Sequence, residues 1–244
     1  MTPGRSSILT WHSLDESGSV ISTPPDVFRR QMEFLAASGI PVLPLDQVLQ
    51  RPGSVAITFD DGFANLAPHA LPLLHRYNFP ATIFVVSKFC GKFNNWPSQP
   101  ANGIPMLPLL SWKDLAELPP AITIGAHTAT HPDLSLLTPA DSDAEMHSSK
   151  DEIEQRLGKP VRWFAYPYGA SSPQVRKIAE RHFDLAVGTA LGWLPSTAER
   201  MDLPRIDTYY LRGAFPLDRM FTAYGAAYVA GRRLLRDVRR VLTR

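Results

Sequence analysis

The feature that most constrains the fold of this chain is the alternation of short, β-prone runs with helical segments along most of its length. Such alternation indicates a largely parallel sheet with helices outside it. We expect strands at residues 7–11, 41–43, 55–59, 81–86, 122–125, 163–166 and 185–188, and helices at residues 25–38, 66–77, 112–118, 140–157 and 173–181. Residues near both ends of the chain are expected at one mouth, which favours a closed barrel over an open sheet.

The composition is that of an ordinary soluble protein. With 244 residues, of which 44% are hydrophobic and 20% charged, the chain is long enough for one barrel with a full core, and no linker divides it. Its single cysteine, Cys90, excludes an intrachain disulfide. Because the formal net charge is only +2 and no basic motif is interleaved with aromatic residues, nucleic-acid binding is not expected.

Two adjacent carboxylates, Asp60 and Asp61, follow the expected strand 55–59 and precede Gly62. They would therefore lie at the carboxyl end of a strand, where α/β architectures place their chemistry. Two neighbouring anions repel, so the pair needs a cation or a shared proton if it is buried. On its own, an Asp-Asp-Gly sequence is more often a surface turn.

A second polar cluster holds two histidines, His127 and His131, directly after the strand-like run 122–126. At this spacing both imidazoles would project from one side of a helical turn, with β-carbons roughly 6 Å apart. Two histidine nitrogens and a carboxylate oxygen form a three-ligand set that leaves a position for water, as in catalytic zinc sites. A lone pair of this kind is often incidental, but the combination with the aspartates indicates a metal site.

Aromatic residues mark three further segments. In the run 166–169, a proline and a glycine flank Tyr168 and predict a tight turn, which either presents a backbone N–H to a pocket or simply ends a strand. Trp96 lies in a Pro/Gly/Asn-rich loop, 91–108, that could form one wall of a cleft. Trp193 either lines a sugar-binding groove or packs in a loop.

The motifs at residues 58–62, 127–131 and 166–169, in this order, resemble those of the polysaccharide deacetylases, carbohydrate esterase family four with its NodB homology domain. The resemblance extends over roughly residues 5–210. The opening run 9–13 also resembles the strand-plus-histidine start of members that include poly-N-acetylglucosamine deacetylases. The resemblance implies an α/β fold, a distorted (β/α) barrel of about seven parallel strands, which we expect to occupy residues 1–212.

The resemblance also implies a function and a role for each motif residue. Asp61, His127 and His131 match the metal ligands of the family, Asp60 matches its general base, and the backbone N–H of Tyr168 matches its oxyanion donor. The expected activity is metal-dependent hydrolysis of N-acetyl groups, or formyl groups, on an amino sugar within a polysaccharide or a lipid-linked glycan. Zinc is the expected ion, with cobalt, nickel and manganese as alternatives.

The chain departs from the family pattern at two positions. The family usually has an arginine where this chain has Ala165, and a late histidine as general acid, whereas no histidine follows His182. We expect Arg205, in a strand-like segment, to replace the arginine and His12, at the end of the first strand, to replace the acid. The alternative is that the protein is a degenerate, non-catalytic relative that binds carbohydrate.

The C-terminal segment, residues 213–244, has apolar residues at helical spacing and arginines on the other side. The apolar residues are Leu217, Phe221, Tyr224, Tyr228, Leu235, Val238 and Leu242, and the basic ones are Arg232, Arg233, Arg236, Arg239 and Arg240. One interpretation is a final helix packed on the barrel with a solvated basic face. The other is attachment to an anionic membrane surface, which would suit a lipid-linked substrate.

The location of the protein is predicted from two negative observations. Residues 1–24 lack the basic start and apolar core of a signal peptide, and no apolar run approaches the ~20 residues that span a bilayer. We therefore expect a cytoplasmic protein, with membrane association through the C-terminal helix as the second option.

Overall fold

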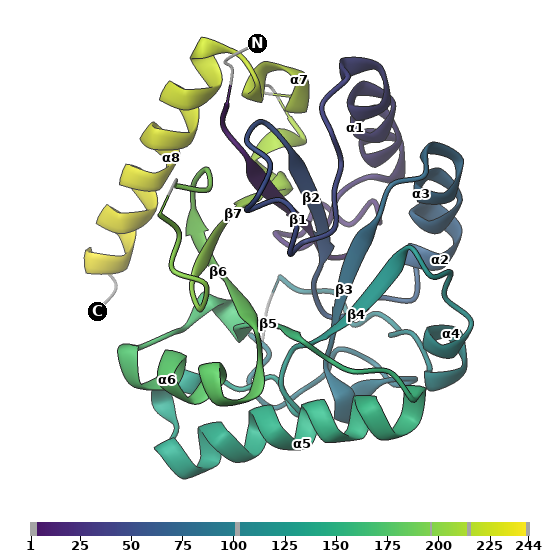
Figure 1. Cartoon of the computed structure of the whole chain (residues 1–244), viewed down its shortest axis with the longest axis vertical. Coiled ribbons are helices and arrows are strands. Elements are labelled where there is room, and N and C mark those ends of the chain that lie inside the picture. The colour runs from purple at the N-terminus through teal and green to yellow at the C-terminus, as the bar shows by residue number, and fades with distance from the viewer. Residues whose placement is uncertain (1–3, 101–102, 196, 214–215, 243–244) are drawn as a thin grey trace.

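Seven parallel strands form a closed barrel in the computed structural model, which describes residues 4–100, 103–195, 197–213 and 216–242 (Figure 1). The strands are β1 (Ser7–Trp11), β2 (Val55–Phe59), β3 (Ala81–Val85), β4 (Ile122–Ala126), β5 (Trp163–Ala165), β6 (Leu185–Leu191) and β7 (Leu203–Asp207). They follow one another around the barrel in chain order, and β7 closes it by pairing with β1. The expected seven-stranded, distorted barrel is confirmed.

Helices cover the outside of the barrel (Figure 1). They are α1 (Pro25–Ser38), α2 (Leu66–His69), α3 (Leu71–Tyr77), α4 (Trp112–Ala116), α5 (Pro139–Leu157), α6 (Pro173–His182), α7 (Leu217–Met220) and α8 (Ala223–Leu242). The signals at the ends of α5 are typical of well-defined helices: the Thr138 side chain accepts a hydrogen bond from the Asp141 N–H, and Gly158 ends the helix in the left-handed conformation. Short 3-10 turns η1 (Ser87–Phe89), η2 (Leu134–Leu136), η3 (Pro167–Gly169) and η4 (Thr208–Leu211) follow β3, β4, β5 and β7.

Two expectations about these elements are wrong. Residues 41–43 are not a barrel strand; they make only an isolated bridge, in which Leu43 donates to the Val55 carbonyl oxygen. Prolines at positions 41 and 44 lack an N–H, which limits pairing there. The expected helix 66–77 is divided at Ala70 into α2 and α3, because Pro72 has no N–H to continue the helix.

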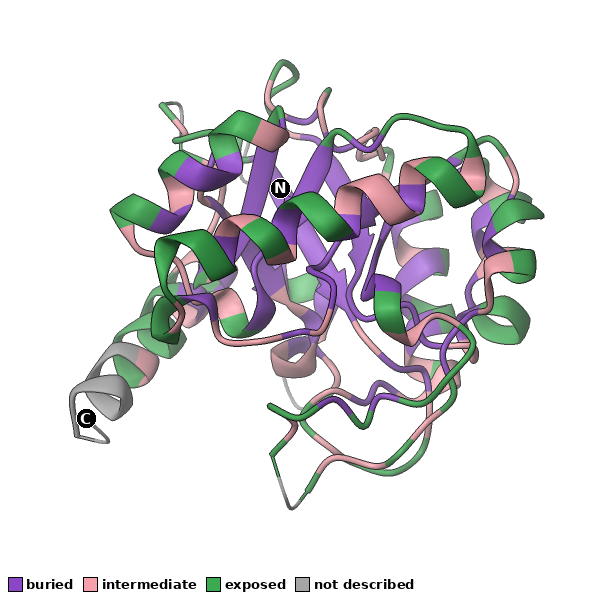
Figure 2. Ribbon diagram, turned by 90° about the horizontal axis from the view of Figure 1, so that it is seen from below, coloured by how far each residue is buried: buried purple, intermediate pink, exposed green. Residues whose placement is uncertain are grey.

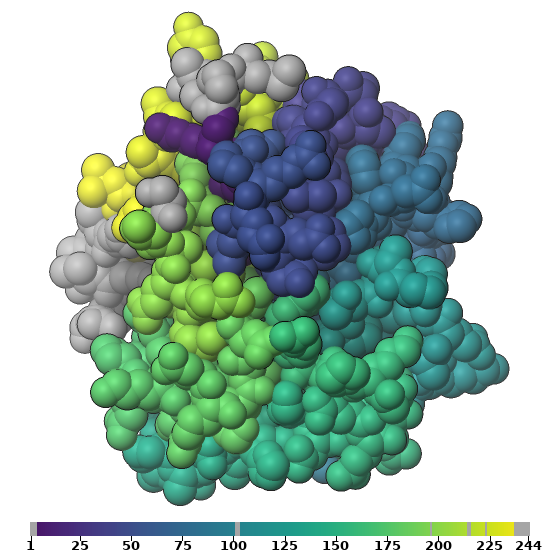
Figure 3. Space-filling view, in the orientation of Figure 1, coloured from purple at the N-terminus to yellow at the C-terminus, as the bar shows by residue number. Residues whose placement is uncertain are grey.

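Alternate residues of the strands face two different cores. Ile8, in β1, packs in one cluster with residues of β2, β3, β5, β6 and β7, whereas its neighbour Leu9 packs against the helices. Figure 2 shows the strands as the most buried part of the molecule. The cluster that contains Ile8 also includes Leu45 and Val48, and Leu194 packs against it. These residues close the end of the barrel at which the strands begin, and the segments around residues 45–50 and 197–203 lie side by side on that face in Figure 3.

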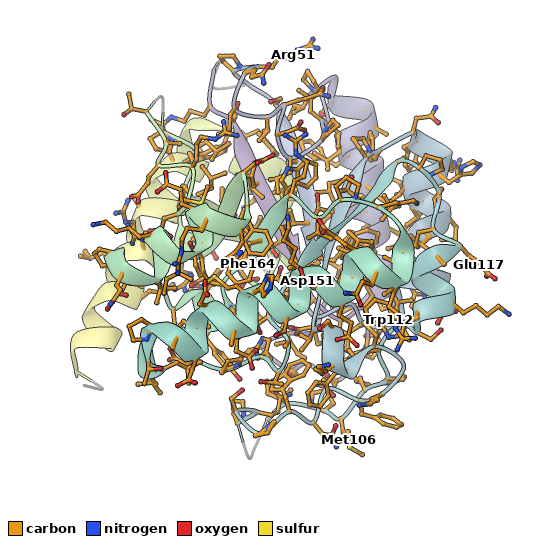
Figure 4. All side chains as sticks on the ribbon, turned by 60° about the horizontal axis from the view of Figure 1, so that its bottom comes forward. Arg51, Met106, Trp112, Glu117, Asp151 and Phe164 are labelled. Carbon is orange, nitrogen blue, oxygen red and sulfur yellow. The ribbon has the colours of Figure 1, made fainter. Side chains whose placement is uncertain are left out.

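The opposite end, where the strands finish, forms the mouth of the barrel. Arg51 lies just before β2, at the end where the strands begin, and Met106 lies in the loop that follows η1, beyond the end of β3. Figure 4 shows these two residues at opposite ends of the view. The aspartate pair directly follows β2, the histidine motif follows β4, and η3 follows β5. The three sequence motifs therefore meet at the mouth, as the parallel arrangement requires. Within the described ranges, no helix is both long and apolar enough to cross a bilayer.

Candidate active site

A left-handed turn at the end of β2 separates the two adjacent carboxylates. Asp61 has a φ of 69° and Gly62 a φ of 74°, and the Gly62 N–H donates to the Asp60 carbonyl oxygen at 2.9 Å. The Asp60 N–H donates to the carbonyl oxygen of Trp11 at 2.9 Å, which continues the β1–β2 ladder by one residue. The turn allows the Asp60 carboxylate to face Arg205 while the Asp61 carboxylate faces the two histidines.

The segment that carries the histidines is an irregular loop, so the expected helical turn is wrong. Thr128 and His131 have φ values of 67° and 60°, which no α-helix contains. The Thr128 hydroxyl oxygen accepts a hydrogen bond from the His131 N–H at 2.9 Å. The carboxylate of Glu145, in α5, accepts hydrogen bonds from the N–H groups of Ala129 and Thr130, each at 2.9 Å. These bonds to α5, which packs against β4, hold the loop in its conformation.

The loop nevertheless brings both imidazoles to one carboxylate oxygen. The Nε2 atoms of His127 and His131 each lie 3.4 Å from Asp61 Oδ1, and all three residues are buried. Within the described part of the chain, this trio is the one group of three or more potential ligands whose donor atoms converge. Two ligands of one tetrahedral zinc ion, each ~2.05 Å from it, would be ~3.3 Å apart.

The hydrogen bonds around the trio also fit a metal ion. The Nδ1 atom of His127 lies 2.8 Å from the carbonyl oxygen of Ala165, to which it must donate. In the neutral ring this leaves the lone pair of Nε2 directed to the site, as is usual for a histidine ligand. Asp61 Oδ1 is buried without a hydrogen-bond partner among the described residues, which an ion would supply. The residues present therefore fit a divalent metal.

Arg205 lies where the sequence analysis expected it. Its NH1 and NH2 groups donate to the two carboxylate oxygens of Asp60 at 2.7 and 2.6 Å, and its NH1 group also donates to the Thr10 hydroxyl at 3.0 Å. The arginine side chain is 1% exposed and extends through the interior of the barrel from β7. The Nε2 atom of His12, directly after β1, lies 3.8 Å from Asp60 Oδ2. Both residues that were expected to replace missing family groups are thus next to Asp60.

Burial and charge act in opposite directions on the acidic and basic groups of the site. Burial by itself would raise the pKa of Asp60, but the charge and hydrogen bonds of Arg205 hold that pKa well below its usual range. The pKa of Asp61 is also lowered, because the two imidazoles outweigh its burial. Burial lowers the pKa of His131 to about 3, so this ring is neutral and able to bind a metal at physiological pH.

Aromatic side chains form one wall of the mouth. The centre of the Trp96 ring, in the loop 91–108, lies 4.3 Å from the centre of the His131 ring, and the centre of the Tyr168 ring lies 4.7 Å from it. The Tyr168 hydroxyl donates to the Ser98 carbonyl oxygen at 2.8 Å, and the Ser98 hydroxyl donates to the carbonyl oxygen of His131. This loop therefore contacts the site, as the sequence analysis suggested. Tyr168 has a φ of 56° in the tight turn η3.

Sequence reasoning missed Glu145, which lies in a polar helix and has no motif of its own. Its contact with the histidine loop links residues 15 and 16 positions apart, and only the fold reveals it. Trp193 packs against Phe221 at 5.9 Å, and the cavity it lines, of about 430 Å³ between β6 and α8, includes none of the candidate site residues.

Comparisons with known proteins agree with this fold. The sequence model of the polysaccharide deacetylases matches residues 48–183. The protein YxkH of Bacillus subtilis is 29% identical over 187 residues, which are 73% of this chain and 62% of YxkH. A chitin deacetylase of Colletotrichum lindemuthianum is 30% identical over 152 residues, which are 62% of this chain and 52% of that protein. The chain thus spans about half to three fifths of the length of these relatives.

A solved structure supports the same assignment. The Streptococcus pyogenes deacetylase PplD, in complex with acetate, superposes with a TM-score of 0.71 at 25% identity, covering 84% of this chain and 93% of PplD. Fold and site together define a parallel barrel protein with a candidate hydrolytic centre at its mouth. The chain belongs to the polysaccharide deacetylase family, carbohydrate esterase family four with the NodB homology domain.

Proposed function

We propose that this protein is a metal-dependent hydrolase that removes N-acetyl groups from an amino sugar, within a polysaccharide or a lipid-linked glycan. The observation that carries the proposal is the buried group of Asp61, His127 and His131 beside a second carboxylate, Asp60, which is held separately by Arg205. The deacetylase relatives support the reaction type, and the name of the Colletotrichum protein gives chitin as the substrate of that enzyme.

The three converging side chains would hold one divalent ion, for which zinc is the first candidate and cobalt, nickel and manganese are alternatives. Such an ion, when bound, polarises the amide carbonyl and makes water acidic enough to attack at neutral pH. The buried position of the trio and its short donor separations of 3.4 Å favour a compact, low-coordinate site.

Asp60 is proposed as the general base. It is not needed as a ligand, because both of its oxygens accept hydrogen bonds from Arg205. Its lowered pKa keeps it ionised at neutral pH, which a proton acceptor requires, and the acidity that a bound metal would give to water would supply the driving force for the transfer. Arg205 fixes the direction of the carboxylate and so takes the place of the family arginine that Ala165 replaces.

His12 is proposed as the general acid. When the C–N bond of the amide breaks, the leaving amine needs a proton, and imidazole is the side chain best suited to supply one near neutral pH. The Nε2 atom of His12 lies 3.8 Å from Asp60 Oδ2, and its side chain is 22% exposed, so it is in reach of a substrate at the mouth. The products are acetate and the free amino sugar.

The backbone N–H of Tyr168 is proposed as the donor to the oxyanion of the tetrahedral intermediate, a contact worth ~3 kcal/mol of barrier reduction. The tight turn η3 holds this residue in place, and its ring contacts His131 at 4.7 Å. The alternative of a non-catalytic carbohydrate-binding relative is not favoured, because the ligand set, the base and neighbours able to replace both missing groups are all retained.

Metal content and acetate release test the proposal together. The purified protein should contain one divalent ion per chain and release acetate from N-acetylated chito-oligomers. The double variant His127→Ala/His131→Ala should lose both properties. Asp60→Asn should keep the ion and lose activity by ~10²-fold or more. An Asp60→Asn variant that loses its ion as readily as Asp61→Asn would show that the two aspartate roles are wrongly divided.

A further inference from the structure

Among the described side chains of the last helix, α8, the buried ones lie in its first turns. Gly225 and Val229 are buried, and the hydroxyl of Tyr228 donates to the Tyr210 carbonyl oxygen at 2.8 Å. From residue 230 to residue 235 every side chain is exposed. Figure 2 shows this part of the helix extending away from the body of the molecule, mostly in the colour of exposed residues.

One exposed side of α8 is apolar. Tyr224, Leu234 and Leu235 are 80%, 64% and 63% exposed, and they are among the few large hydrophobic side chains that the described surface presents to water. Ten and eleven residues are about three helical turns, so both leucines lie on the same side as Tyr224. Val229 precedes Leu234 by about one and a half turns and therefore faces the other way, toward the barrel. The apolar stripe thus points away from the protein.

The opposite side of the same segment is strongly basic. Residues 232–240 contain five arginines and one aspartate, in a chain whose formal net charge is only +2. The guanidinium groups of Arg232 and Arg236 lie 5.5 and 6.0 Å from the centre of the Tyr210 ring. Tyr210 is in η4, directly after the carboxyl end of β7, so this half of α8 lies beside the mouth of the barrel.

The sequence continues both faces to the end of the helix. Val238 and Leu242 follow Leu235 at intervals of three and seven residues, and so extend the apolar stripe. Arg239 and Arg240 extend the basic side in the same way. The structure does not describe the side chains of these four residues, which are placed here by sequence position alone.

We propose that residues 230–242 of α8 are a docking surface for an anionic membrane. A helix with an apolar stripe and a basic opposite side lies in the bilayer interface, with the stripe among the acyl chains and the arginines near the lipid phosphates. Charge favours an anionic membrane over a second copy of the chain as the partner of this surface. A second α8 would bring five more arginines to the contact, whereas anionic lipids neutralise the arginines that are already there. The proposal does not depend on the proposed hydrolase activity.

Vesicle flotation with the full-length chain tests the proposal. The protein should float with vesicles that mix phosphatidylcholine and phosphatidylglycerol, remain unbound with phosphatidylcholine alone, and lose binding as salt is raised. Leu234→Ser/Leu235→Ser should weaken partitioning by about tenfold or more. Arg232→Gln/Arg236→Gln should weaken it by about thirtyfold, since each basic residue near the lipid contributes to binding.

Matched substitutions elsewhere on the surface serve as controls. Leu136→Ser removes a leucine that is 82% exposed in η2, and Arg29→Gln/Arg30→Gln removes two exposed charges from α1. Neither should change flotation, and thermal unfolding should show that all variants fold. Equal binding to neutral and anionic vesicles, no binding to either, or equal losses in the controls would overturn the proposal. A dimer in sedimentation that Leu234→Ser/Leu235→Ser dissociates would identify a second copy as the occupant and also overturn it.

Discussion

Replacing Arg205 by methionine should destabilise the protein strongly, because it leaves a buried carboxylate without its cation. Arg205 is 1% exposed and donates to both oxygens of Asp60, whose side chain is 4% exposed. Methionine has a similar length and can fill the space inside the barrel, so the main loss is the charge pair and not the packing.

Removing one partner of a buried pair costs about 3–5 kcal/mol, since the remaining ion keeps its desolvation penalty. A domain of ordinary stability, about 5–15 kcal/mol, could remain folded but with a much reduced margin. The double variant Asp60→Asn/Arg205→Met removes both charges and should recover most of that loss. The effects of the two substitutions should therefore be far from additive.

The loss should depend on pH in a defined direction. The pKa of Asp60 is lowered in the folded protein relative to the unfolded value of ~3.9, chiefly because Arg205 outweighs the effect of burial. A group of this kind stabilises the fold fully above its unfolded pKa, and the contribution is lost as pH falls through the folded pKa. The stability gap between the natural protein and Arg205→Met should be largest near neutral pH and smaller below about pH 4.

Urea unfolding followed by circular dichroism at neutral and acidic pH measures these quantities. Arg205→Met should lose several kcal/mol of unfolding free energy at neutral pH, and the double variant should recover most of it. The stability difference between the natural protein and Arg205→Met should become smaller on acidification. A loss below about 1 kcal/mol, the value of an exposed ion pair, would refute the reasoning. A gap that widens toward acidic pH would refute it as well.

Three further predictions concern groups around the site. Glu145→Gln should lower metal affinity by about 10–100-fold in competition titrations, because the loop that carries His131 loses its charged acceptor. Unchanged affinity would show that the loop keeps its conformation without the charge of Glu145. Gly169→Ala should impair turnover more than metal binding, because a Cβ there would lie 1.9 Å from Thr189 Oγ1 and disturb the turn η3; normal turnover would argue against a role for that turn. His12→Ala should reduce turnover while the metal is retained, and unchanged turnover would assign the acid to another group.

The sequence predicted the parts of this structure that depend on local patterns. The Asp60 and Asp61 pair and both histidines were placed at strand ends because strand-forming runs precede them directly. The conformation of the histidine loop could not be predicted in this way: its left-handed residues are held by Glu145, a tertiary contact with no local signal. The segment 41–43 was misassigned because its apolar pattern resembles a strand, whereas its flanking prolines prevent one.

The bond between Arg205 and Asp60 was predictable for a topological reason. The first and last strands of a closed barrel are neighbours, so a residue on the last one can reach the end of the second across the interior. The direction of the apolar stripe on α8 was not predictable, because helical periodicity reveals two faces without telling which one meets the barrel.

Reconstitution of the metal-free protein shows whether an ion held by Asp61, His127 and His131 is required for hydrolysis. The natural protein and the His127→Ala/His131→Ala variant are stripped with a chelator, supplied with zinc, and assayed for acetate release from an N-acetylated chito-oligomer. The stripped natural protein should be inactive, one equivalent of zinc should restore acetate release, and the variant should stay inactive with zinc. Full activity of the stripped protein, or equal recovery in the variant, would contradict this requirement.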